Sequence, residues 1–385
     1  MDHPYLTPTH ISFRQVLRQF LDREARPFFT AWEQARRIPR EFWLSLGAQG
    51  YLCPMVDEEY GGAGADFGYA VVLTEELERI GSGLTGIGLH NDIVVPYLTQ
   101  YGSPEQKARW LPGCLTGNII TALAMTEPEA GSDLSAVRTT AIRDQESYLV
   151  SGQKTFITNG GQADLILVLV KTDPRADPPH QGMSLILVEA TTPGFSRGRV
   201  FHKIGQHSQD TAELRFDACR VPATNLLGIE GQGFRYVTEK LRQERLIVAI
   251  AAQASMERAL ELTRDYVMKR VQFKKPLSDF QALRFTMAEL ATRVRVSRTF
   301  VDHVIAQHLV NQATVSDASM AKWWATDTAK DIISTCMQLH GGNGYMEDYE
   351  IARRYRDIAV MPIYAGTNDI MKSIIAKQFF SESHD

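Results

Sequence analysis

The chain has 385 residues, of which 44% are hydrophobic and 22% are charged, and its formal net charge at pH 7 is −4. This length allows two or three domains with a large core, and the composition is that of an ordinary globular protein. The slightly acidic balance provides no overall positive field, which argues against a nucleic-acid-binding protein.

The cysteines give no sign of a disulfide framework or a zinc site. They stand far apart, at Cys53, Cys114, Cys219 and Cys336, and form no CxxC pair, which fits a reducing compartment. The N-terminal segment MDHPYLTPTH lacks the basic and apolar regions of a signal peptide. No run of about 18 apolar residues is present. We therefore expect a cytoplasmic protein without membrane insertion.

Residues 1–120 are expected to form an N-terminal helical domain. Apolar residues recur at helical spacing from Ile11 to Leu21. The segment Ser103–Gln106 has the form of a helix start, with a serine cap, a proline in the first turn and a glutamine three residues after the cap. Residues 60–64, YGGAG, are expected to form a loop because so many glycines suit neither a helix nor a strand.

Residues 121–229 differ in character and are expected to form a central antiparallel β domain. Turns rich in glycine, proline and aspartate separate short strand-like runs at 148–150, 165–170, 185–188 and 214–216. No strand in this region is followed by the GxGxxG pattern of a Rossmann unit. Any nucleotide cofactor must therefore be held by another kind of site.

Residues 230–385 are expected to form a C-terminal helical bundle. Long periodic segments cover roughly 234–270, 280–310, 314–340 and 368–380, enough for a four-helix bundle. The predicted fold class is therefore an α+β multidomain protein, with a helical domain, an antiparallel β domain and a helical bundle in that order.

One carboxylate interrupts the apolar stripe of the first of these helices. Phe234, Val237, Leu241 and Val248 recur at helical spacing, and Glu244 falls within the same stripe. A carboxylate there is expected to be partly desolvated, which makes it a stronger base than a solvated one. From this helix alone, a glutamate at the edge of the stripe, paired with an arginine, is the more ordinary interpretation.

Four further segments carry groups suited to a cofactor or an anion. The loop 124–133, AMTEPEAGSD, offers backbone N–H groups and hydroxyls to an anion such as pyrophosphate. In the segment GQKTFITNG, strand alternation directs Phe156 and Thr158 to one side, where they suit a planar ring. The segments 338–345 (QLHGGNGY) and 363–370 (IYAGTNDI) adjoin helices, and a helix start favours an anion. Taken singly, each motif is equally well explained by an ordinary turn, strand or helix cap.

In this order and at these separations, the motifs resemble those of the acyl-CoA dehydrogenase family over essentially the whole chain. AMTEPEAGSD resembles the flavin-loop signature of that family, and FITNG resembles its flavin-stacking strand. The segment 270–281, RVQFKKPLSDFQ, and the two glycine-rich segments resemble its C-terminal cofactor segments. The resemblance is closest to the long-chain branch, including LRQERL around Glu244.

The resemblance implies an FAD-dependent enzyme, usually a homotetramer, in which FAD lies between the β domain and the bundle and is completed by a neighbouring subunit. The residues implied to hold FAD are Met125, Thr126, Gly131, Ser132, Phe156, Thr158, Arg270, Gln272, Phe273, Phe280, Gln281, Gln338, Gly341, Gly342, Thr367 and Asp369. Those implied to contact the substrate are Ser132, Leu241, Arg245 and Gly366. No metal is implied.

Two residues depart from the common family pattern. Many members carry a catalytic glutamate where this chain has Ala365. The isovaleryl and long-chain branches also lack it and place the base on the bundle helix, in a sequence like QERL. The resemblance therefore implies Glu244 as the base and the backbone N–H of Ala365 as a donor to the thioester oxygen. The second departure is Lys274, where the family usually has a glycine, which tolerates a positive φ.

The implied reaction is the α,β-dehydrogenation of a medium- or long-chain acyl-CoA, straight or branched, to the trans-2-enoyl-CoA, as in the β-oxidation of fatty acids. Hydride passes to flavin N5, and the electrons pass on to an electron-transfer flavoprotein. Arg245 points about 100° away from Glu244 on an ideal helix and has either a ligand-binding or a structural role.

Three alternatives remain open. Within the same fold, the substrate could be carried on an acyl-carrier protein, or the enzyme could be an acyl-CoA oxidase of a secondary pathway. The remote alternative is a DNA-binding relative. From residue 230 onward there are 21 Lys+Arg and 19 Asp+Glu, and this difference of +2 is too small for the electrostatic footprint of a nucleic-acid binder.

Overall fold

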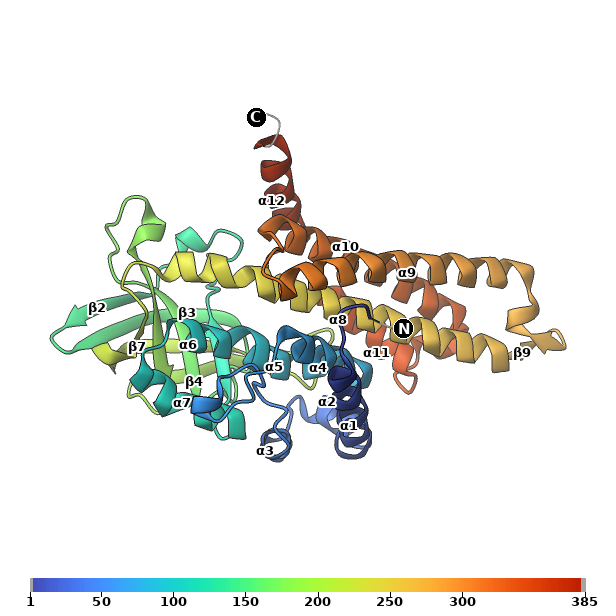
Figure 1. The fold of residues 1–385 in the computed structure, drawn as a ribbon, viewed down its shortest axis with the longest axis horizontal. Helices are drawn as coiled ribbons and strands as arrows, with labels where there is room; N and C mark the ends of the chain where they lie inside the picture. Colours follow the sequence, from blue (N-terminus) through green and yellow to red (C-terminus); the bar gives the residue numbers. More distant parts are fainter. Residues whose placement is uncertain (1–2, 382–385) are drawn as a thin grey trace.

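The computed structural model describes residues 3–381 of the chain. A helical region, a β-sheet and a second helical region follow one another in the predicted order, which confirms the predicted fold class (Figure 1). The N-terminal segment and the outer ends of the expected ranges 1–120 and 230–385 extend beyond the described residues. Within residues 3–381, no helix is both long enough and apolar enough to cross a membrane.

Short helices form the N-terminal region around an aromatic-rich core. α1 (Pro8–Glu24) packs against α4 (Phe67–Ile80). α7 (Pro104–Thr116) begins at the predicted capping box, in which the backbone N–H of Gln106 donates to Ser103 Oγ and that of Ser103 donates to Gln106 Oε1. The other helical elements are α2 (Phe29–Ala35), α3 (Arg40–Ala48), η1 (Glu58–Tyr60), η2 (Ser82–Leu84), α5 (Thr85–Gly88), the π-helix η3 (Leu89–Val94) and α6 (Val95–Tyr101).

The central sheet has eight strands within the described residues, in the order β6-β7-β3-β2-β4-β5-β8 with β1 also paired to β4. They are β1 (Thr121–Ala124), β2 (Thr140–Asp144), β3 (Ser147–Thr158), β4 (Leu165–Lys171), β5 (Met183–Glu189), β6 (Phe195–Val200), β7 (Thr211–Pro222) and β8 (Leu226–Leu227), with the short turns η4 (Leu134–Ala136), η5 (Pro179–Gly182) and η6 (Ala223–Asn225) between them. Most neighbours are antiparallel, as predicted. The parallel pairing of β1 with β4, in which Thr121 lies opposite Leu165, was not predicted, because strand patterns do not show the direction of a distant partner.

Three long helices, α8 (Gly233–Lys269), α9 (Gln281–Leu309) and α10 (Val315–Leu339), run side by side in the described C-terminal region (Figure 1). The fourth expected helix, α12 (Asn368–Ser381), contacts α10 and then projects away from the bundle (Figure 1). Only its first turn is buried, at Asn368 and Met371, whereas Phe379 and Phe380 are exposed. The remaining elements are β9 (Val271–Gln272), β10 (Lys275–Pro276), η7 (Leu277–Asp279), η8 (Gly341–Tyr345), α11 (Glu350–Asp357) and η9 (Ile358–Val360).

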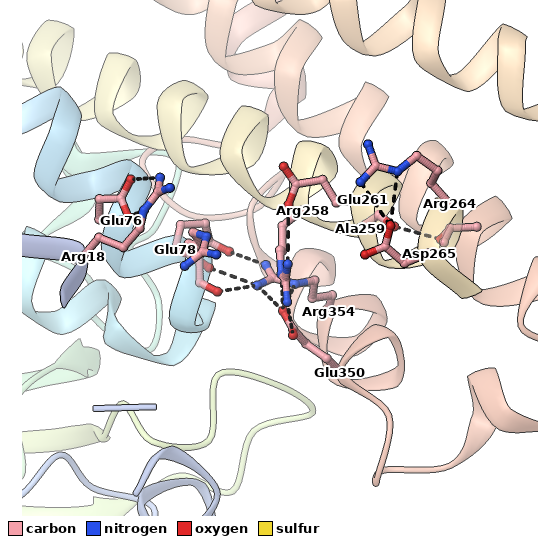
Figure 2. Close-up of polar contacts among 12 residues, drawn as sticks. Arg18, Glu76, Glu78, Arg258, Ala259, Glu261, Arg264, Asp265, Glu350 and Arg354 are labelled. Carbon is pink, nitrogen blue, oxygen red and sulfur yellow. Dashed lines mark hydrogen bonds and ion pairs between the residues drawn. The ribbon is translucent and has the colours of Figure 1, made fainter. Parts of the chain in front are cut away.

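Buried ion pairs tie the N-terminal region to the C-terminal helices. Arg354 of α11 is 1% exposed, and its Nη2 atom donates to Glu350 Oε1 at 2.7 Å and to the backbone oxygens of Glu78 and Arg79 at 3.2 Å (Figure 2). Arg258 of α8 pairs with the same Glu350 at 3.0 Å (Figure 2). These contacts hold α4, α8 and α11 in fixed relative positions. α8 itself starts beside the sheet, where it contacts β5, and ends at the β9–β10 hairpin.

Candidate active site

Glu244 lies on α8 where this helix passes η3 and α6. Two contacts fix the alignment of the helices. The side-chain amide of Gln243 donates to the backbone oxygen of Asp92 at 2.7 Å, and the ring of Tyr101 stacks on that of Tyr236 with the centroids 4.0 Å apart. η3 and α6 therefore run antiparallel along the first half of α8, and Glu244 follows directly after the contact with the π-helix. π-helical turns occur frequently at functional sites.

The Glu244 carboxylate forms no ion pair or hydrogen bond with any residue in the described part of the chain, and its Oε2 atom is buried. Burial raises the pKa of Glu244 to about 7, and the nearby charge of Arg245 offsets only part of this effect. The ordinary interpretation, a glutamate paired with an arginine, is therefore wrong. A carboxyl group whose pKa lies near neutral pH is suited to take up and release a proton.

Arg245 connects α8 to the segment 364–367, which precedes α12. Its side chain is 5% exposed, and its Nη1 atom lies 3.4 Å from Ser319 Oγ on α10. Its Nε atom is buried and has no partner among residues 3–381. A methyl group built on Gly366 would lie 4.0 Å from Arg245 Nη2. The guanidinium group is therefore held beside the backbone of Gly366, with hydrogen-bonding capacity left over.

The segment 364–367 has an unusual backbone. Ala365 and Gly366 have φ angles of 54° and 85°, so two successive residues are left-handed. This conformation strains an alanine, which persists in it only where the surrounding structure enforces it. The backbone N–H of Ala365 donates to no acceptor in residues 3–381. It is therefore a free donor beside Arg245 and Gly366.

Two tyrosines near Glu244 were not identified from the sequence. The hydroxyl groups of Tyr97 on α6 and of Tyr364 are both buried, and neither has a hydrogen-bond partner within the described residues. Burial raises the pKa of both, and the negative charge of Glu244 raises that of Tyr97 further. For Tyr364 the charge of Glu78 contributes more than that of Glu244, and the side chain of Gln206 lowers the pKa. The signal in the sequence was weak, because a tyrosine among apolar residues is usually part of the core.

A buried ion pair joins β3 to the loop that contains Met125 and Thr126. Lys154 Nζ donates to Glu127 Oε1 at 2.8 Å and to the backbone oxygen of Met125 at 3.0 Å. The backbone N–H of Thr155 donates to the oxygen of Thr126 at 2.9 Å. The structure therefore brings this loop next to Phe156 and Thr158. The pair itself was missed in the sequence, where Lys154 has no distinguishing pattern.

Phe156 presents its ring to the solvent. Its side chain is 64% exposed, its φ is 59°, and its ring centroid is 5.0 Å from that of Phe201. Thr158 is on the same side of β3, and its hydroxyl accepts a hydrogen bond from Gln209 Nε2 at 2.9 Å. The Oε1 atom of Gln209 is buried without a partner among residues 3–381. An exposed aromatic face beside unsatisfied polar groups is a surface suited to a planar polar ring.

Comparison with known proteins identifies the chain. Models for the N-terminal, middle and C-terminal domains of acyl-CoA dehydrogenase match residues 7–118, 122–219 and 231–380. The long-chain specific acyl-CoA dehydrogenase of Mus musculus mitochondria is 44% identical over 374 residues, which are 97% of this chain and 87% of that protein. The chain belongs to the acyl-CoA dehydrogenase family. Members of this family are FAD-dependent oxidoreductases that dehydrogenate acyl-CoA substrates.

Two bacterial acyl-CoA dehydrogenases agree with this assignment. The acyl-CoA dehydrogenase of Bacillus subtilis is 37% identical over 97% of this chain and 98% of its own length. The crystal structure of the acyl-CoA dehydrogenase from Geobacillus kaustophilus is 58% identical and superimposes with a TM-score of 0.97, covering 98% of this chain and 100% of that one. The whole acyl-CoA dehydrogenase fold is therefore present in this chain.

The residues around Phe156 fit the FAD that acyl-CoA dehydrogenases require. The exposed ring offers a face to the flavin, and the Thr158–Gln209 pair offers polar groups to its edge. Gly131 and Ser132 lie in an exposed loop, where a methyl group added to Gly131 would meet no atom within 4 Å. Asp133 caps η4 at this point, because its side chain accepts from the N–H of Ser135.

The predicted cofactor residues of this acyl-CoA dehydrogenase fall into two separated groups. Arg270 follows the last residue of α8, and the 26 residues from Glu244 to Arg270 correspond to roughly 39 Å of helix. Gln338, Gly341 and Gly342 lie near that same end, because Tyr266 Oη donates to the backbone oxygen of His340 at 3.0 Å. Within one chain, these residues and the group Gln272, Phe273, Phe280 and Gln281 are therefore far from Glu244.

Two of the remaining predicted residues are placed close to Glu244 or to Arg245. Leu241 lies one turn before Glu244, and Gly366 lies beside Arg245. Thr367 Oγ1 accepts from the backbone N–H of Ile370 at 3.3 Å and so caps the start of α12, whereas Asp369 is exposed. No group of His, Cys, Asp or Glu side chains in residues 3–381 has the arrangement of a metal site.

Proposed function

We propose that this enzyme dehydrogenates medium- to long-chain acyl-CoA thioesters between Cα and Cβ and that Glu244 is the catalytic base. The observation that carries the proposal is the unpartnered Glu244 carboxylate, whose Oε2 atom is buried and whose pKa is raised to about 7. The next residue, Arg245, lies beside Gly366, which follows the free N–H of Ala365. Ala365 cannot replace it, because a methyl group cannot accept a proton.

The chemistry begins at the weakly acidic α C–H bond of the thioester. As Glu244 removes this proton, negative charge develops on the thioester oxygen, which a preorganised N–H donor stabilises. The free N–H of Ala365 is suited to that role. When bound, FAD accepts the β-hydrogen as hydride. The buried surroundings of Glu244 exclude water and keep the carboxyl group basic enough to act near pH 7.

The buried tyrosine hydroxyl groups are suited to donate hydrogen bonds to the ionised form of the base. In its neutral form the Glu244 carboxyl group needs no strong partner, but its ionised form needs donors in a buried site. The Tyr97 and Tyr364 hydroxyl groups are unused donors within the electrostatic reach of Glu244. Arg245 supplies positive charge on the side of Gly366, which favours the ligand-binding alternative for this residue.

A cavity at the start of α8 supports CoA as the carrier. It has a volume of about 560 Å³, and its lining includes His180, Phe234 and Arg235. The rings of His180 and Phe234 lie 5.2 Å apart, an arrangement suited to an adenine base, and Arg235 is suited to a phosphate. The ten residues from Phe234 to Glu244 correspond to roughly 15 Å of helix, a distance that suits an extended thioester arm.

The proposal includes a homo-oligomer, an electron acceptor and a location. In the same chain, the segments Arg270–Gln281 and Gln338–Gly342 are roughly 39 Å along α8 from Glu244. We therefore infer that a second copy of the chain brings these segments to the FAD beside Phe156. The family resemblance implies that the two copies are part of a homotetramer. An electron-transfer flavoprotein is the proposed acceptor. The free, buried thiols support the expected cytoplasmic compartment.

Anaerobic mixing of the FAD-loaded enzyme with a saturated acyl-CoA series from C4 to C18, including branched members, tests the function. We expect bleaching of the flavin to be fastest at medium to long chain lengths, as the similarity to long-chain relatives suggests. Acyl-carrier-protein thioesters should be poor substrates in the same assay, and oxygen admitted after the bleaching should reoxidise the flavin only slowly. An enzyme bleached by none of the acyl-CoA esters, or only by carrier-protein esters, would contradict the proposal.

A further inference from the structure

Lys322 is a fully buried lysine on α10, directly behind the strained segment 364–367. Its exposed fraction is 0%, and its Nζ atom donates to the backbone oxygen of Gly366 and to Asn368 Oδ1, both at 2.9 Å. It forms no ion pair within the described residues. A buried ammonium group without a carboxylate partner is costly, so a purely structural role does not explain why a lysine occupies this position.

Lys322 also belongs to a larger clamp on the same segment. Asn368, which it contacts, donates from Nδ2 to Thr326 Oγ1 at 2.9 Å and to Asp327 Oδ1 at 2.7 Å, both on α10. The backbone N–H of Asn368 donates to the oxygen of Pro362 at 2.9 Å. These hydrogen bonds fix the segment at Pro362 and at Asn368. Within this clamp, Lys322 is the residue that contacts Gly366, which lies between those two positions.

The clamp acts on the residue whose backbone matters for the proposed chemistry. Ala365, at φ 54°, precedes Gly366, at φ 85°. An alanine is strained in the left-handed region and stays there only where contacts offset the strain, and the Lys322 hydrogen bond fixes the carbonyl of Gly366, the next residue. Without this contact, the turn is free to relax and the N–H of Ala365 turns away from its present direction.

Two cations flank this turn. Arg245 approaches Gly366 from α8, and its Nη1 atom lies 3.4 Å from Ser319, one turn before Lys322 on α10. Burial and the nearby charge of Arg245 lower the pKa of Lys322 to about 8, against the opposing effect of Asp327. Lys322 is therefore still mostly protonated near pH 7. The turn sits in a positive environment, which favours negative charge developing next to it.

We propose that Lys322 is the positioning residue of the oxyanion site: its ammonium group holds the Gly366 carbonyl so that the Ala365 N–H is directed at the thioester oxygen. This inference rests on the proposed function, because it assigns that N–H to the thioester. Lys322 touches neither the substrate nor the reacting atoms and acts only through the turn. The role of Glu244 is a separate claim, and the two can fail independently.

The carbonyl stretch of a bound thioester reports directly on this donor. The probe is trans-2-dodecenoyl-CoA labelled with ¹³C at the carbonyl, bound to the oxidised, FAD-loaded enzyme and measured by infrared difference spectroscopy. In the wild type, hydrogen bonding lowers the stretching frequency below its value in water. In Lys322→Met we expect at least half of this shift to be lost and kcat on dodecanoyl-CoA to fall 10- to 100-fold, the range of a weakened oxyanion donor.

Lys330→Met is the matched control, since it makes the same substitution at an exposed position of the same helix. It should keep the wild-type frequency and kcat, and FAD content and melting temperature are measured for every variant. If Lys322→Met does not fold, Lys322→Gln replaces it in the test. Its side chain carries a neutral donor and is one bond shorter than that of lysine. We expect it to lose at least a quarter of the shift.

The outcomes distinguish the role of Lys322 from the oxyanion role of Ala365. A wild-type shift that persists unchanged in a folded Lys322 variant overturns the role of Lys322. A wild type without any shift overturns the oxyanion role of Ala365 itself, and therefore this inference with it. Loss of kcat in Lys322→Met without loss of the carbonyl shift assigns Lys322 a structural role and also overturns the inference.

Discussion

Glu244 and Arg245 are consecutive residues of α8, yet their charged groups form no ion pair with each other. On a helix their side chains point about 100° apart, and the Arg245 guanidinium turns toward Ser319 and Gly366. Glu244 Oε2 is left buried without a partner in residues 3–381. The carboxylate is therefore kept free for an external proton, at the expense of the stability that a buried pair would provide.

Replacing Glu244 by glutamine should stabilise the folded protein above neutral pH. The folded-state pKa of Glu244 is about 7 against an ordinary 4.5, so above pH 7 folding buries an ionised group, whereas below pH 4.5 the group is neutral in both states. The free energy of unfolding of the variant should exceed that of the wild type by about 1–3 kcal/mol at pH 8 and by little at pH 4.5. Denaturant titrations at both pH values measure this, and a difference independent of pH would contradict it.

The Lys154–Glu127 pair should be a major support of the flavin loop. Both side chains are buried, and Lys154→Met leaves Glu127 without a cation, which should lower the free energy of unfolding by about 3 kcal/mol. FAD retention on gel filtration should fall as well, because Lys154 also holds Met125. The double variant Lys154→Met/Glu127→Gln should recover part of the stability. Equal stability of the single variant and the wild type would show that the pair is dispensable.

Lys274→Gly should stabilise the hairpin between β9 and β10. Phe273 and Lys274 form its two-residue loop and have φ angles of 47° and 67°. A turn with positive φ at both central residues favours glycine, so the substitution should raise the free energy of unfolding by up to about 1 kcal/mol. Lys275→Gly, in β10, is the control and should not stabilise. A destabilising Lys274→Gly would indicate that the lysine side chain makes a contact that outweighs the strain.

Ala365→Glu should restore part of the activity lost in Glu244→Gln. The new carboxyl group would start from the residue whose N–H is proposed to bind the thioester oxygen and would face the same α-carbon. We expect turnover of the double variant to exceed that of Glu244→Gln at least tenfold while staying below the wild type. Ala365→Gln in the Glu244→Gln background is the matched control without a base. Equal turnover of the two double variants would rule out a shared position for the two carboxyl groups.

Much of the fold could be predicted from local patterns. The capping box at Ser103 and Gln106, the strand runs and the long periodic helices depend on residues close in sequence, and these predictions were confirmed. The departure of α12 from the bundle and the parallel pairing of β1 with β4 were not predicted, because both depend on distant partners. Glu244 stood out for the same local reason, as a carboxylate within an apolar stripe.

The surroundings of Glu244 could not be predicted in the same way. Its lack of a partner depends on which side chains α6 and the segment 364–367 bring near it. Lys322 had one overlooked signal, since it occurs at helical spacing with Ala318, Ala325 and Ala329, all of which are buried. A lysine within a stripe of small residues is as informative as a glutamate within an apolar one.

The rate of flavin reduction in a single anaerobic turnover, measured against pH in the wild type and in Glu244→Gln, tests the central claim most directly. The account predicts that the wild-type rate rises with pH up to about 7 and then levels off, because only the ionised carboxylate accepts the α-proton. Glu244→Gln should bind FAD but lose at least 99% of the rate at every pH. A variant rate within threefold of the wild type, or a wild-type rate independent of pH between 5 and 8, would contradict the assignment of Glu244 as the base.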